Sequence, residues 1–125
     1  MPELVVARYT REEIQSNPDK IYVFGDNLAR QGYGGQAKEA RDEPNAIGIP
    51  TKFSPYDFLT DDDFDAWLPI AIQDCNRIRK AQEDGKTIVW PKDGIGTGLA
   101  ALEKHAPKIW RKLQEMIADL RKEKA

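Results

Sequence analysis

The sequence has few of the residues that build redox and metal sites. It contains one cysteine, Cys75, and one histidine, His105, in 125 residues. A single cysteine cannot form an internal disulfide or a thiolate cluster, and a single histidine in a helical segment leaves no Ser/His/Asp triad. We therefore expect no redox chemistry, no metal site and no cofactor. Cys75 is expected to pack as a small apolar residue on a helix.

Strong net charge and long apolar runs are also missing. The 19 Lys and Arg residues are balanced by 21 Asp and Glu residues, for a formal net charge of −2. No general basic field is available to coat nucleic acid. The longest apolar runs, near residues 4–7 and 68–72, fall far short of the ~20 residues that span a bilayer. With no secretory signal pattern at the start, we expect a cytoplasmic protein that does not contact a membrane.

The length predicts one domain. A chain of 125 residues buries roughly two-thirds of its unfolded surface around one core and is too short for two. We expect residues 1–120 to form this domain and the charged residues 121–125 to be a frayed tail.

Short apolar runs alternate with helical patterns along the chain. Composition rich in β-branched and aromatic residues predicts strands at residues 4–9, 20–24, 46–49 and 86–90. Helical patterns occupy residues 10–15, 35–42, 60–84 and 99 onward. Pro50 is expected to end the third strand, and Pro69 to kink the third helix or delay its start. The alternation predicts an α/β domain, a three-layer sandwich with a mostly parallel central sheet.

Both central strands lead into glycine-rich loops, residues 25–35 and 94–98. In a parallel sheet the carboxyl ends of neighbouring strands meet at one edge, so the two loops are expected to line one crevice. Backbone N–H groups and helix N-termini at that crevice would suit a phosphate or diphosphate. Alternatively, the glycines serve only the positive φ angles of tight turns. Neither loop is a Walker A motif, which disfavours a triphosphate held with magnesium.

Four segments together resemble the macrodomain family, whose members bind ADP-ribose. The segments are Val23-Phe-Gly-Asp-Asn27, Gly32-Tyr-Gly-Gly-Gln-Ala37, Gly48-Ile-Pro-Thr-Lys52 and Val89-Trp-Pro-Lys-Asp-Gly-Ile-Gly-Thr-Gly-Leu99. The resemblance covers about residues 20–118 and is nearest to the branch that removes ADP-ribose from glutamate. It implies a small macrodomain-like fold. The implied partner is an ADP-ribose-like small molecule or an ADP-ribosylated macromolecule.

The resemblance also implies which residues bind the ligand. The first loop would hold the distal ribose and the second would wrap the diphosphate, and Lys52 would contact the distal ribose. The implied binding residues are Asn27, Gly34, Gly35, Gln36, Gly94, Ile95, Gly96, Thr97, Gly98 and Leu99.

Asp26 and Lys52 are the candidate catalytic residues. Asp26 could orient a water as a general base, or it could serve only as a capping or turn residue. Lys52 could neutralise the ligand or attack an opened ribose, or it could be a solvated surface lysine. The glutamate-specific branch needs a carboxylate just beyond the second loop, where this chain has Ala100 and Ala101.

Three functions therefore remain open. The first is binding of ADP-ribose or a related nucleotide derivative, with hydrolysis of an ADP-ribosyl ester or of a terminal phosphate. The second is a non-catalytic binder that sequesters or senses a nucleotide signal. The third is a protein-interaction module without a ligand, with Trp67, Trp110 and the basic last helix as its contact face.

Overall fold

A computed structural model describes residues 2–97 and 100–122 and has an α/β fold. Four strands form one parallel sheet in the order β1-β4-β2-β3. The strands are β1 (Glu3–Val6), β2 (Lys20–Asn27), β3 (Ala46–Lys52) and β4 (Thr87–Pro91). Within the described ranges every strand pair is parallel. The predicted α/β class with a central parallel sheet is thus confirmed.

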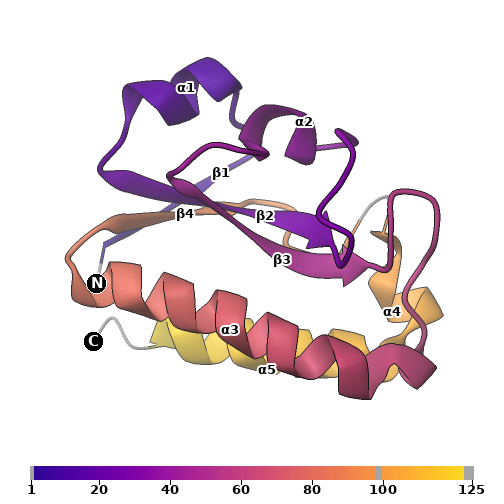
Figure 1. Ribbon diagram of the computed structural model, residues 1–125. Coiled ribbons are helices and arrows are strands. Elements are labelled where there is room, and N and C mark those ends of the chain that lie inside the picture. Colours follow the sequence, from indigo (N-terminus) through magenta and orange to yellow (C-terminus); the bar gives the residue numbers. More distant parts are fainter. Residues whose placement is uncertain (1, 98–99, 123–125) are drawn as a thin grey trace.

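Helices cover both faces of this sheet and make the outer two layers (Figure 1). The helices are α1 (Arg11–Ser16), α2 (Ala37–Ala40), α3 (Phe64–Glu83), α4 (Leu102–His105) and α5 (Pro107–Lys122). In Figure 1, α1 and α2 lie on one face and the long helices α3 and α5 lie on the other. Among the described residues, no helix combines the length and apolarity needed to cross a membrane.

Two hydrophobic clusters hold the layers together. The larger one contains Val23 of β2 and Ile109 and Leu113 of α5. The smaller one contains Tyr22 of β2 and Ile14 of α1. Neighbouring residues of β2 thus belong to different clusters, because successive side chains of a strand point to opposite faces. Burial on both faces explains why this segment of the sequence is continuously apolar.

Two strands extend further than the sequence predicted. β2 continues through Gly25 to Asn27, so the first loop begins three residues later than expected. β3 passes through Pro50 and ends at Lys52, so the prediction that Pro50 ends this strand was wrong. β3 is an edge strand, and an edge tolerates a proline because its missing N–H need not pair with a neighbour.

The helices beside the loops are shorter than predicted. The pattern over residues 35–42 yields only the four residues of α2, and the four-residue α4 precedes α5. Helices this short have little macrodipole, so the expected contribution of helix N-termini to the crevice is small. Pro107 is the first residue of α5, the position where proline is favoured.

Two further expectations about helices need correction. The 3₁₀ turn η1 (Asp61–Asp63) leads directly into α3, which continues unbroken through Pro69. The prediction that Pro69 delays the start of this helix was therefore wrong. Pro69 is exposed, so the backbone carbonyl that loses its helical hydrogen bond to the proline can bond water instead. α5 extends into the predicted tail, where Arg121 pairs with Glu3 at 2.8 Å. The rest of that tail, residues 123–125, lies outside the described ranges.

Candidate functional site

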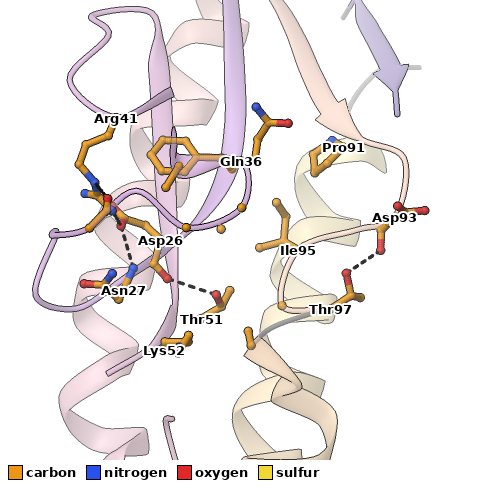
Figure 2. A pocket seen from close by; sticks show the side chains of 18 of the residues that line it. Asp26, Asn27, Gln36, Arg41, Thr51, Lys52, Pro91, Asp93, Ile95 and Thr97 are labelled. Atoms are coloured by element: carbon orange, nitrogen blue, oxygen red, sulfur yellow. Dashed lines mark hydrogen bonds and ion pairs between the residues drawn. The ribbon is translucent and has the colours of Figure 1, made fainter. Parts of the chain in front are cut away.

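A cavity of about 420 Å³ lies at the carboxyl ends of the strands (Figure 2). β2 and β4 are parallel neighbours, in register from Lys20 and Thr87 onward, so the loops that follow them leave the same edge of the sheet. The cavity is lined by every predicted site residue that the structure describes: Asp26, Asn27, Gly34, Gly35, Gln36, Lys52, Gly94, Ile95, Gly96 and Thr97. Gly98 and Leu99 lie outside the described residues.

The cavity has two walls, which face each other in Figure 2. One wall carries Asp26, Asn27, Gln36, Thr51 and Lys52, and the other carries Pro91, Asp93, Ile95 and Thr97. The first wall comes from the ends of β2 and β3 and from the first glycine loop. The second wall comes from the end of β4 and the second loop. The predicted convergence of the two loops is therefore present.

The reason why glycine occupies a position differs from one loop residue to another. Gly96 has a φ of +91°, and a Cβ there would lie 3.0 Å from the Leu102 side chain, so the fold itself requires glycine. Gly34 has no positive φ, and a Cβ there would meet no atom within 4 Å. Neither turn geometry nor packing within the described residues explains Gly34. Its backbone is open to the cavity that it lines.

Asp26 is buried and fully engaged with neighbouring donors. Its side chain accepts hydrogen bonds from Arg41 at 2.5 Å, from Arg30 at 3.3 Å and from the Asn27 N–H at 2.8 Å. Arg41 also donates to the carbonyls of Gln31 at 3.1 Å and Gly32 at 2.5 Å. The carboxylate thus anchors the first loop through Arg41. These contacts favour a structural role for Asp26 over a role as a general base.

The charged network continues from the cavity wall to α3. Arg30 donates to Asp74 at 2.5 Å, and Asp74 is only 3 % exposed. Burial raises the pKa of Asp74, and the nearby Arg30 opposes this increase. Arg30 also donates to the carbonyl of Gly48 at 3.1 Å. One guanidinium therefore connects the first loop, the edge strand β3 and α3.

The amide side chains of Asn27 and Gln36 hold backbone segments. Asn27 donates to the Gln31 carbonyl at 2.7 Å and accepts from the Gln31 N–H at 3.3 Å. Gln36 donates to the Tyr9 carbonyl at 2.6 Å and accepts from the Tyr9 N–H at 3.3 Å. Both residues line the cavity, and their contact with a ligand remains a prediction.

Lys52 lies at the β3 end of the cavity. Its ammonium donates to the Pro55 carbonyl at 2.8 Å and lies 5.3 Å from the centre of the Phe58 ring. Phe58 in turn stacks on His105, with ring centres 3.9 Å apart. These contacts hold the lysine at the cavity wall, where its charge is available to an anionic ligand.

Sequence analysis missed two arginines that line the cavity, Arg8 and Arg41. β1 ends at Val6, two residues before Arg8, whereas the sequence placed Arg8 inside a predicted strand at residues 4–9. Arg41 was assigned to a helix, but it ends α2 as its C-cap and turns its side chain back to Asp26. No local pattern indicates a pairing between residues 15 positions apart.

Several side chains have clear structural roles. Trp67 is 0 % exposed and donates to the Pro50 carbonyl at 2.8 Å, so its predicted place in a protein contact face was wrong. Asp61 accepts hydrogen bonds from the N–H groups of Lys108 at 2.9 Å and Ile109 at 3.4 Å, which caps α5. Within the described part of the chain, no group of three or more His, Cys, Asp or Glu could hold a metal ion.

Fold and site together define an α/β protein with a ligand-sized cavity formed by two glycine loops at the carboxyl edge of a parallel sheet. The chain belongs to a family of unknown function (DUF7831), whose model matches residues 4–116. That range includes every residue that lines the cavity. Comparison with curated proteins and with solved structures gave no significant match.

Proposed function

We propose that the cavity binds ADP-ribose or a related nucleotide derivative. The observation that carries this proposal is Gly34, a cavity-lining glycine that neither its φ angle nor any contact with the described residues requires. A ligand lying against the backbone accounts for such a glycine, because any side chain would occupy the ligand's space. Phosphate groups are suited to this position, since their oxygens accept from exposed N–H groups.

The size and charge of the cavity agree with a nucleotide. Its volume of about 420 Å³ lies within the range of roughly 300–1,000 Å³ that is usual for small-molecule sites. The charged lining residues are Arg8, Arg41, Lys52, Asp26 and Asp93, an excess of one positive charge, and Asp26 is paired with Arg41. The macrodomain resemblance assigns the distal ribose to the first glycine loop and Lys52, and the diphosphate to the second glycine loop.

The variant Gly34→Ala tests this proposal with little risk to the fold. A methyl group there meets no atom of residues 2–97 or 100–122 within 4 Å, so we expect the unfolding temperature to stay unchanged. In the complex the methyl group would overlap the ligand, and a loss of about tenfold in affinity corresponds to a modest overpacking cost. Isothermal titration calorimetry with ADP-ribose measures the change. No binding to the wild-type protein at millimolar ligand would contradict the proposal.

Gly34→Glu provides a graded comparison, because it adds bulk and a negative charge at the same position. It should weaken ADP-ribose binding more than Gly34→Ala does. Gly96 is unsuitable for this purpose, since its positive φ and its closeness to Leu102 mean that a substitution would strain the fold.

Non-catalytic binding is the form of this function that we favour. Asp26, the candidate base, is occupied by Arg41, Arg30 and the Asn27 N–H. Hydrolysis would then depend on Lys52. Product assays with an ADP-ribosylated glutamate peptide and with ADP-ribose-1″-phosphate distinguish the two forms. Turnover that Lys52→Ala abolishes, with ADP-ribose binding retained, would favour the enzyme.

A further inference from the structure

Arg8 and Lys52 line the same cavity and lie at or just after the ends of the two opposite edge strands of the sheet. Arg8 follows β1, and Lys52 is the last residue of β3. The strand order β1-β4-β2-β3 places these two strands at the two edges. Neighbouring strands are ~4.8 Å apart, so three intervals separate the two strand ends by ~14 Å. The cavity thus has a lining cation at or just after the end of the strand at each edge of the sheet.

The backbone around Arg8 is attached to both glycine loops. The Val6 carbonyl accepts a hydrogen bond of 2.8 Å from the N–H of Lys92, just before the second loop. Tyr9 exchanges two hydrogen bonds with the Gln36 side chain of the first loop. Tyr9 is also buried, and its hydroxyl donates to the Val23 carbonyl. Arg8 therefore starts from a backbone position that is fixed relative to the cavity.

Arg8 has no electrostatic partner among the described residues. The other cavity arginine, Arg41, is paired with Asp26, and Arg30 is paired with Asp74. Arg8 is exposed, lines the cavity and forms no hydrogen bond or ion pair within the described ranges. A guanidinium presents a planar fork of donors that matches two phosphate oxygens. A free fork at a ligand cavity is suited to a phosphate group.

We infer that Arg8 binds a phosphate monoester on the nucleoside ribose of the ligand, separate from the diphosphate at the second glycine loop. The inference rests on the proposed function. With the distal ribose at Asn27 and Lys52 and the diphosphate at the centre, the nucleoside end extends toward β1 and Arg8. A nucleotide derivative with this additional phosphate is then the preferred ligand.

The test compares two ligands that differ only in this phosphate, ADP-ribose and ADP-ribose 2′-phosphate, by calorimetry. The wild-type protein should bind the 2′-phosphate at least about tenfold more tightly, as expected for a charge-assisted bidentate contact. Arg8→Gln should lose this preference and bind the two ligands with equal affinity, because the affinity for the 2′-phosphate falls more than the affinity for ADP-ribose. Arg111→Gln is the matched control, because Arg111 is exposed on α5 and does not line the cavity. It should retain the preference.

Three results would overturn the role of Arg8: equal binding of the two ligands by the wild-type protein, a preference that survives in Arg8→Gln, or an equal loss for both ligands in that variant. The last result would indicate a contact with the base or the diphosphate. Failure of the wild-type protein to bind either ligand would overturn the proposed function and this inference with it. ADP-ribose binding in the wild-type protein therefore separates the two failures.

Discussion

Asp26 and Arg41 form an ion pair beneath the first glycine loop, with side chains only 5 % and 8 % exposed. We predict that Asp26→Asn lowers the free energy of unfolding by about 3 kcal/mol, because it leaves a buried guanidinium without its counter-charge. Urea denaturation measures the loss. Asp93→Asn is the matched control on the exposed cavity rim and should change stability little. An unchanged urea midpoint for Asp26→Asn would contradict the anchoring role.

Cys75 has a pKa that burial raises from 9.0 to about 11. Because the folded protein then holds the thiol proton more tightly than the unfolded chain, this residue's contribution to stability is complete below pH 9 and declines as the pH rises toward 11. Cys75→Ala should lack this component, so its stability should fall less steeply over that range. Denaturant unfolding at several pH values checks this. Parallel pH profiles would show that the thiol does not contribute.

Every described residue that was predicted for the site lines the cavity, but Arg8, Arg41 and the contacts of the side chains were not predicted. The convergence of the two loops followed from the position of strand ends at one side of a parallel sheet, and the macrodomain resemblance implied the individual residues Asn27, Lys52 and Gly96. The pairing of Asp26 with Arg41 depends on how the chain returns after α2. Local patterns contain no such information. The sequence alone therefore does not distinguish whether Asp26 is a general base or an ion-paired anchor of the loop.

Among the elements, strands and helices were predictable in type, and their ends were not. β3 continues through Pro50 because it lies at the edge of the sheet, and the edge position follows from strand order. α2 is shorter than its helical composition suggests. It ends at Arg41, whose backbone is extended and whose side chain binds Asp26. In both cases a tertiary contact overrides the local preference.

The hydrogen bond between Trp67 and Pro50 connects α3 to the edge strand. The indole of Trp67 donates to the Pro50 carbonyl at 2.8 Å inside the core. We predict that Trp67→Phe destabilises the protein by about 2 kcal/mol, since it leaves a buried carbonyl unpaired and a small void. Chemical denaturation measures the effect. A variant as stable as the wild-type protein would show that β3 does not need this contact.

For the molecule as a whole, alternating strands and helices were sufficient to predict a layered domain with a parallel sheet. The order of the strands was not predictable, because β1 pairs with β4, far from it in the sequence. That order brings Arg8 into the cavity beside the second glycine loop. The fold thus adds a cation to the site that the loop motifs alone do not indicate.

The central claim is that the two glycine loops jointly hold one ligand, and backbone amide NMR tests it most directly. We predict that titration with ADP-ribose shifts the amide signals of Gly34, Gly35, Gly94 and Gly96 together, with one dissociation constant. Gly85, in the turn between α3 and β4, lies outside the cavity lining and should not move. Shifts confined to one loop, or no shifts at millimolar ADP-ribose, would contradict the account.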